Sequence, residues 1–128
     1  MSQGKFMKLR IKGNSIRLRL SKTEVERLAV DAYLEEHTSF GAGSLTYTLQ
    51  SMEGVDNLSA SFAHDKIDVV IPKIFVTDWA GNNVTGFDGY MPVNETDSLY
   101  ILVEKDFKCV EKAVEDQSDN YENPNKTC

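Results

Sequence analysis

The sequence has few cysteines and no long apolar run. Only Cys109 and Cys128 occur among its 128 residues, too few for the disulfide framework of a small secreted domain, so we expect both as reduced thiols. No stretch approaches the roughly 20 apolar residues that a membrane span needs, and the first residues, MSQGKFMKLR, lack the apolar block of a signal peptide. These absences predict a cytoplasmic protein with no membrane partner.

Patterns typical of catalysis and metal binding are also absent. The chain has no glycine-rich phosphate loop, no Ser-His-Asp order and no sequence repeat. Cys109, Cys128, His37 and His64 are residue types that bind metals, but they show neither C-x-x-C nor H-x-x-x-H spacing. Glu104 and Asp106 share one side of a strand end, where paired acids are usually surface charges. We therefore predict no catalytic residue, no metal and no cofactor, and a protein more typical of a binding module than of an enzyme.

Charge is unevenly distributed along the chain. The net charge of -6 argues against nucleic acid as a partner. The first 20 residues nevertheless contain no acid and six cations, Lys5, Lys8, Arg10, Lys12, Arg17 and Arg19. The region from 111 to 122 is the reverse, with the acids Glu111, Glu115, Asp116, Asp119 and Glu122 against Lys112. The two ends of the chain are electrostatic complements.

Apolar and basic residues alternate at the start of the chain. Residues 7–12 and 16–20 follow the period of two that half-buried strands show, and Gly13-Asn14 between them suits a tight hairpin turn. Ser21 followed by Glu24 fits a capping box, which predicts a helix from Lys22 to about Tyr33.

The rest of the chain predicts more strands and a second helix. A short strand is expected over 34–40, clearer ones over 45–50, 58–62 and 67–71, a helix over 73–79, a weak strand over 84–87 and a strong one over 99–103. The strands from 34 to 71 are expected to form a meander of three or four antiparallel strands, depending on whether 34–40 forms one. The order ββαβββαββ predicts an α+β fold, mainly an antiparallel sheet of six to eight strands with two helices. Whether the sheet forms a partly closed barrel stays open.

We expect one domain over residues 1–108 and a polar, extended or partly disordered tail over 109–128.

Three segments resemble a family of small bacterial proteins described as a domain of unknown function. They are MKLRIKGNSIRLRLSKTEV, LVEKDFKCV and EDQSDNYENP, and the resemblance runs from Met7 to Pro124. It implies a bacterial origin and a shared architecture that includes the Asn14 turn, the Glu104-Lys105-Asp106 step and the acidic tail. It implies no activity.

The basic hairpin is the predicted functional surface. Because side chains alternate across a strand, one face must carry Lys8, Arg10, Lys12, Arg17 and Arg19. Like charges opposite each other are unfavourable, so something should neutralise them. The hypotheses are a bound anion, such as a phosphate that arginine grips in bidentate fashion, a protein partner, or the protein's own tail acids, Glu111, Glu115, Asp116, Asp119 and Glu122. A plain solvated face is a further interpretation.

Two other classes of function remain. Strands with alternating Arg and Lys resemble those of the triphosphate tunnel enzymes, which implies a phosphate-ester or polyphosphate enzyme with a divalent metal. That family begins with an E-x-E-x-K pattern, whereas this chain has Lys8-Leu9-Arg10-Ile11-Lys12, without the acids. The strand-rich pattern also permits a homodimer that pairs edge strands, instead of a monomer.

Overall fold

A computed structural model describes residues 7–107 and Tyr121 of this chain. The described residues form eight strands, two α-helices and one short 3-10 helix, so the predicted α+β class is confirmed. The middle of the chain holds four strands, the larger of the two numbers expected there. The elements are β1 (Lys8–Ile11), β2 (Ser15–Leu20), α1 (Lys22–Asp31), β3 (Tyr33–Ser39), β4 (Ser44–Met52), β5 (Ser59–Ala63), β6 (Lys66–Pro72), α2 (Lys73–Val76), η1 (Trp79–Gly81), β7 (Gly86–Pro92) and β8 (Ser98–Lys105).

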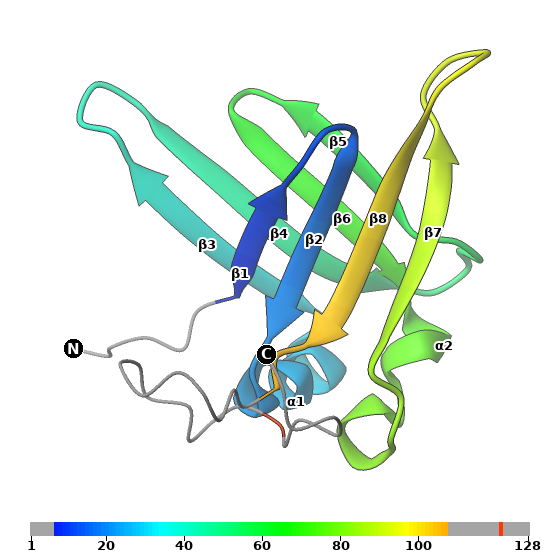
Figure 1. The fold of residues 1–128 in the computed structure, drawn as a ribbon. Helices are drawn as coiled ribbons and strands as arrows, with labels where there is room; N and C mark the ends of the chain where they lie inside the picture. Colours follow the sequence, from blue (N-terminus) through cyan, green and yellow to red (C-terminus); the bar gives the residue numbers. More distant parts are fainter. Residues whose placement is uncertain (1–6, 108–120, 122–128) are drawn as a thin grey trace.

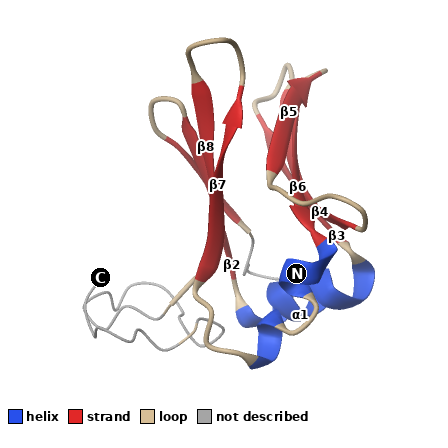
Figure 2. Cartoon of the chain, turned by 90° about the vertical axis from the view of Figure 1, so that its right-hand side faces the viewer, coloured by secondary structure: helices blue, strands red, loops and turns tan. Residues whose placement is uncertain are grey.

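The strands form two separate four-stranded sheets that face each other, and the described residues close no barrel (Figures 1 and 2). One sheet has the order β1-β2-β8-β7 and the other the order β3-β4-β6-β5. The outer pairs of each sheet are antiparallel, but the two central pairs, β2 with β8 and β4 with β6, are parallel. The expected antiparallel meander is therefore wrong at β4. The connection over residues 53–58 carries the chain past one strand position, so β5 lies at the sheet edge and β6 pairs with β4.

The two halves of the chain have the same topology. Each half contains a hairpin, a helical connection and a second hairpin: β1-β2-α1-β3-β4, then β5-β6-α2-β7-β8. Each half contributes its first hairpin to one sheet and its second hairpin to the other, so every sheet contains one hairpin from each half. The order of the elements is duplicated although the sequence shows no repeat, because sheet topology needs only matching hydrophobic periods and turns.

The helices lie together at one end of the two sheets (Figure 2). Helix α1 begins at the predicted capping box, where the Ser21 side chain accepts from the Glu24 amide and the Glu24 side chain accepts from the Ser21 amide. It ends at Asp31, two residues before the predicted Tyr33, and its C-cap is Ala32, which has a φ of 64°. The hairpin turn at Gly13, with a φ of 55°, is also confirmed.

The core lies between the sheets at this helical end. Trp79 is fully buried, and its ring contacts Phe87, which stacks on Phe75 with 4.9 Å between ring centroids. The other fully buried side chains come from both sheets and both helices, among them Leu18, Leu28, Val69, Val76, Ile101 and Val103. These aromatic residues are therefore core, as aromatic residues in a domain of this size usually are.

Some bounds differ from those expected. The predicted helix over 73–79 is split into α2 and η1, and the weak strand over 84–87 begins at Gly86 and continues to Pro92. The expected tail, residues 109–128 with its acids and both cysteines, lies outside the described residues, except for Tyr121, which forms a parallel bridge with Phe107. Within the described part, no helix is long and apolar enough to cross a membrane.

Candidate anion-binding face

The predicted basic residues lie on the outer face of the β1–β2 hairpin. Lys8 is opposite Arg19 and Arg10 is opposite Arg17 in the antiparallel register. The alternate residues of β2, Ile16, Leu18 and Leu20, are buried against the opposite sheet. The apolar residues thus fix which face of the hairpin is inward, and the cations must emerge on the other.

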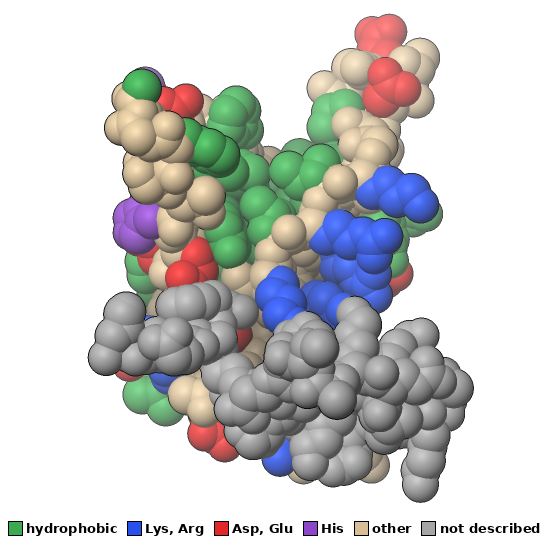
Figure 3. All heavy atoms as spheres, turned by 60° about the vertical axis from the view of Figure 1, so that its left-hand side comes forward, with side chains coloured by type: hydrophobic (Ala, Val, Ile, Leu, Met, Phe, Trp, Pro, Cys, Tyr) green, Lys and Arg blue, Asp and Glu red, His purple; other side chains and the backbone are tan. Residues whose placement is uncertain are grey.

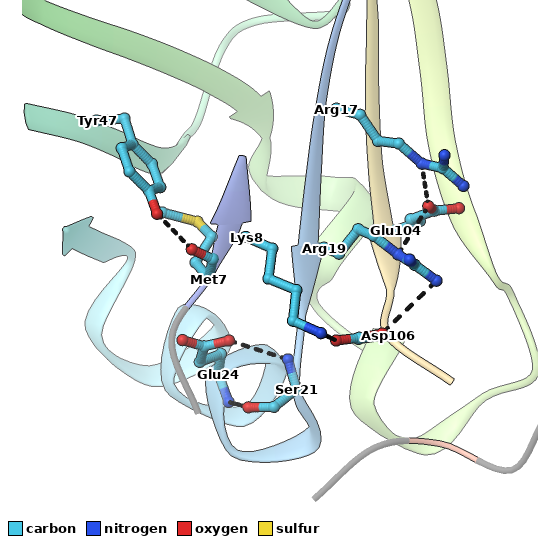
Figure 4. A network of polar contacts seen from close by, with 9 residues as sticks. All are labelled: Met7, Lys8, Arg17, Arg19, Ser21, Glu24, Tyr47, Glu104 and Asp106. Atoms are coloured by element: carbon cyan, nitrogen blue, oxygen red, sulfur yellow. Dashed lines mark hydrogen bonds and ion pairs between the residues drawn. The ribbon is translucent and has the colours of Figure 1, made fainter. Parts of the chain in front are cut away.

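Two acids of β8 and its end neutralise part of this face (Figure 4). Glu104 Oε2 lies 2.5 Å from the Nε of Arg17 and 3.2 Å from the Nε of Arg19. Asp106 contacts the Nζ of Lys8 at 2.8 Å and the Nη2 of Arg19 at 3.6 Å. Both carboxylates are mostly shielded from water, with 16% and 8% of their side chains exposed. Such contacts are stronger than fully exposed pairs because the surroundings screen them less.

The parallel pairing of β2 with β8 brings these acids to the hairpin. Its register places Arg19 opposite Glu104 and Arg17 opposite Leu102. The Asp106 amide then donates to the Leu20 carbonyl, which holds the second acid beside the end of β2. The sequence correctly placed Glu104 and Asp106 on one side of the strand end, but their contacts with the hairpin depend on a pairing that the sequence did not predict.

Three cations of the face surround a small hollow. It has a volume of about 230 Å³ and is lined by Arg10, Lys12, Ser15, Ile16, Arg17, Tyr100 and Leu102. Among residues 7–107, no carboxylate pairs with Arg10 or Lys12. Arg17 uses only its Nε for Glu104, so its two Nη groups have no hydrogen bond within the described part of the chain. The hollow is therefore an electropositive site with unused hydrogen-bond donors.

Tyr100 lies at the edge of the hollow and is already engaged. Its hydroxyl donates to Asp88 Oδ2 at 2.7 Å, and this hydrogen bond is the main cause that raises the pKa of Tyr100 to about 12. Leu102 on β8 pairs with Asp88 of β7 on one side and with Arg17 of β2 on the other. Leu102 therefore lies between Asp88 and Arg17. The acid nearest to the hollow on β7 thus pairs with a phenol and leaves the cations available.

A second polar site surrounds Lys105 at the helical end. The Lys105 residue is only 2% exposed. Its Nζ donates to the Asn82 carbonyl at 2.8 Å and lies 4.6 Å from the Tyr121 ring centroid and 5.8 Å from that of Trp79. Burial lowers the pKa of Lys105, because the charged amine loses hydration. An adjoining pocket of about 400 Å³ is lined by Lys22, Asn82, Asn83, Thr85, Lys105, Phe107 and Tyr121.

The sequence analysis did not predict that Lys105 is buried, although the alternation of residues in β8 indicates it. In β8 the buried residues Ile101 and Val103 alternate with partly exposed ones, and Lys105 continues the buried phase. A lysine in the apolar phase of a strand indicates a buried ammonium group. The partners that tolerate it, a backbone carbonyl and two aromatic rings, are distant in sequence and carry no such signal.

The histidines lie apart from the basic face. His37 on β3 contacts Glu35 at 2.7 Å and Thr46 at 3.0 Å. His64 is in the β5–β6 turn with a φ of 54°. In the part of the chain that is described, no three His, Cys, Asp or Glu side chains are grouped as metal ligands. Cys109 and Cys128 lie outside that part.

Comparison with known proteins identifies one family. A family model described as a family of unknown function, DUF7009, matches residues 7–125. No curated protein and no solved structure matches the chain. The match extends over nearly all of the sequence, and it agrees with the resemblance to a domain of unknown function noted above.

Proposed function

This chain belongs to DUF7009, a family of unknown function, and we propose from its geometry that it is a binding module that takes an oxyanion at the Arg10, Lys12 and Arg17 hollow. The observation that carries the proposal is the state of Arg17. Glu104 holds the Nε edge of its guanidinium, while both Nη groups face no partner within the described residues. A carboxylate that orients an arginine in this way prepares its remaining donors for a ligand.

The size and charge of the hollow favour a small oxyanion. A volume of about 230 Å³ suits a phosphate or carboxylate group better than an extended polyanion. Arginine donors fit the oxygens of such groups because two parallel N–H groups can contact two oxygens. The net charge of -6 over the whole chain disfavours a nucleic-acid backbone, which binds by broad electrostatic attraction.

Ligand-induced stabilisation tests the proposal. The full-length protein is melted at low ionic strength with inorganic phosphate, pyrophosphate or triphosphate, and with sodium chloride at matched ionic strength. A ligand at 100 times its Kd stabilises the fold by about 2.7 kcal/mol, which corresponds to a rise in Tm of roughly 10 °C for a domain of this size. A saturable rise with the oxyanions beyond that with chloride is expected. Equal effects of all salts would overturn the proposal.

A charge-matched pair of variants locates the site. The double variant Arg10→Gln and Lys12→Gln should lose at least tenfold in phosphate affinity, because it removes the two cations of the hollow that pair with no carboxylate among residues 7–107. The control, Arg27→Gln with Lys73→Gln, also removes one arginine and one lysine, both about half exposed and outside the hollow. It should retain the rise in Tm. An equal loss in both variants would indicate general charge attraction and contradict a specific site.

The protein's own acidic tail is an alternative occupant of the same face. Replacing its acids by amides at full length tests this, with Glu111→Gln, Glu115→Gln, Asp116→Asn, Asp119→Asn and Glu122→Gln. If the tail competes for the cations, this variant should bind phosphate more tightly at low salt, and the difference should disappear at high salt because screening weakens exposed pairs. Unchanged affinity would exclude the tail as the occupant.

The same titration separates a binding module from an enzyme. Triphosphate is added with and without magnesium, and released phosphate is measured. Binding without magnesium and without phosphate release supports the module. Magnesium-dependent release that the Arg10→Gln and Lys12→Gln variant abolishes would instead support the phosphate-ester or polyphosphate enzyme implied by the basic strands.

A further inference from the structure

An apolar cleft separates the two sheets at the end opposite the helices. It has a volume of about 510 Å³, and its walls come from the β1–β2 hairpin and from β5, β6, β7 and β8. Hydrophobic side chains gather between the open ends of the two sheets, as Figure 3 shows. The apolar residues of the lining include Ile11, Ile16, Phe62, Ile67, Met91 and Leu99.

The inward faces of the sheets continue beyond the region that the core covers. At the helical end, the inward side chains of Leu18, Val69 and Val103 are fully buried. At the open end, Ile11 is 58% exposed and Phe62 is 68% exposed. Apolar side chains exposed together in a concave site usually mark a ligand or partner surface, since covering them removes apolar area from water.

The cleft is bounded on one side and open at its lip. The Ala60 amide of β5 contacts the Met91 sulfur of β7 at 3.4 Å, which brings the edges of the two sheets together there. The lip is formed by the β1–β2 turn, where Gly13 and Asn14 line the cleft. The Asn14 side chain donates to the Ser98 carbonyl at 2.8 Å, and this contact fixes the turn against the start of β8.

The cleft and the electropositive hollow share one hairpin. Ser15 and Ile16 line both, and Lys12 of the hollow adjoins Gly13 at the lip. None of the described residues that line the cleft is charged, and on the shared hairpin the charge next to the lip is the cation of Lys12. A ligand that matches both surfaces has an apolar chain and a negative head group.

We propose that the cleft binds the apolar chain of an amphipathic carboxylate, with its head group at the Lys12 end of the hairpin. This inference rests on the proposed function, because it assigns the chemical class of the oxyanion that the basic face takes. The apolar chain provides binding energy through burial, and the cation selects the charged head. A volume of about 510 Å³ is in the range of pockets for small organic ligands.

Three ligands separate the two parts of this site. Dodecanoate, dodecanol and acetate are titrated into the full-length protein by calorimetry, below the concentrations at which the long-chain compounds aggregate. Dodecanoate should bind at least tenfold more tightly than either of the others, because dodecanol lacks the charge and acetate lacks the chain. Binding of dodecanoate no tighter than acetate would overturn the use of the cleft. Equal binding of dodecanol and dodecanoate would overturn the role of the head group.

Two matched phenylalanine variants test the location. Phe62→Ser should reduce dodecanoate affinity about tenfold, since Phe62 lines the cleft and its loss leaves the chain less covered. Phe40→Ser is the control, because Phe40 is similarly exposed, at 71%, and does not line the cleft. Both side chains are exposed, so both variants should fold. Equal losses would overturn the location. A concentration-dependent mass that Phe62→Ser abolishes would show that a second copy occupies the cleft and would also overturn the proposal.

The outcome for the cleft is distinguishable from that for the basic face. If Phe62→Ser loses dodecanoate but retains the phosphate-induced rise in Tm, both proposals hold. If the wild-type protein binds phosphate but not dodecanoate, the oxyanion site stands and the cleft proposal fails. If it binds dodecanoate and not phosphate, and Lys12→Gln leaves dodecanoate affinity unchanged, the oxyanion site fails and so does the assignment of the head group.

Discussion

The Nε of Arg17 lies 2.5 Å from Glu104 Oε2, and the two residues are 87 positions apart in the sequence. They are on neighbouring parallel strands, β2 and β8, and the same carboxylate oxygen lies 3.2 Å from the Nε of Arg19. One acid therefore forms ion pairs with two guanidinium groups of the basic hairpin, but among the described residues it hydrogen-bonds only that of Arg17. We therefore expect both the stability of this face and the proposed anion binding to depend on Glu104.

Replacement of Glu104 by glutamine should destabilise the protein. The variant Glu104→Gln removes the charge that offsets Arg17 and Arg19, and we expect a loss of about 1 to 2 kcal/mol in the free energy of unfolding, measured by urea denaturation. The loss should be larger at low salt, because repulsion among the remaining cations is then less screened. Asp31→Asn is the control, since Asp31 lies 4.0 Å from Arg27 in an exposed pair. Equal losses in the two variants would contradict this role of Glu104.

The capping box gives a second prediction about stability. Ser21→Ala should lower the free energy of unfolding by about 1 kcal/mol, because the Glu24 amide loses the buried oxygen that accepts its hydrogen bond. The control is Ser39→Ala, in which the lost acceptor serves the Gly41 amide in an exposed turn. That control should change stability by a few tenths of a kcal/mol. Thermal melts of both variants give the comparison, and a larger loss in the control would show that the cap contributes little.

The elements that the sequence predicted are those that depend on local contacts. The first hairpin needs only alternation and the Gly13 turn, and helix α1 needs the Ser21 cap and an apolar stripe. The pairing of the sheets could not be predicted, because β2 meets β8 and β4 meets β6 across long intervening segments. A period of two in each strand is compatible with parallel and antiparallel neighbours alike, so the pattern left the meander and the two-sheet arrangement undecided.

The candidate site divides in the same way. Alternation alone placed the cations on one face, and the register of the hairpin sets Lys8 opposite Arg19 and Arg10 opposite Arg17. Which cations stay available depends on the register of β8, and no local pattern carries that register. The apolar cleft could not be predicted either. The strand pattern identifies Phe62 only as an inward residue, and the cleft exists because the two sheets are separated at that end.

The buried amine of Lys105 should be visible in the pH dependence of stability. Burial lowers the pKa of Lys105 in the folded protein, whereas in the unfolded chain its pKa is about 10.4. Between those two values the unfolded state binds more protons, so this group makes the free energy of unfolding rise with pH.

The variant Lys105→Met should lack that rise. Urea denaturation at pH 7 and in the alkaline range is expected to show that the wild-type protein gains stability relative to Lys105→Met as the pH increases. Lys73→Met serves as the control, because Lys73 is half exposed and pairs with Glu53. If the difference between wild type and Lys105→Met stays constant with pH, Lys105 has an ordinary pKa in the folded protein.

Two glycines of β7 test the close packing between β7 and β8. A Cβ at Gly86 would lie 2.6 Å from the Val103 carbonyl oxygen and 2.8 Å from the Glu104 Cα, and neither backbone atom can move without shifting β8. Gly86→Ala should therefore cost about 2 kcal/mol or more, as overpacking of a fixed site does. It should also weaken phosphate binding, because the shift reaches Glu104, which orients Arg17.

Gly89, on the same strand, provides the control. A Cβ there would meet nothing within 4 Å, so Gly89→Ala should be neutral or slightly stabilising when both variants are compared by urea denaturation. Equal stability of the two variants would mean that β8 can move away from β7 freely, and that the position of Glu104 is not fixed by this contact.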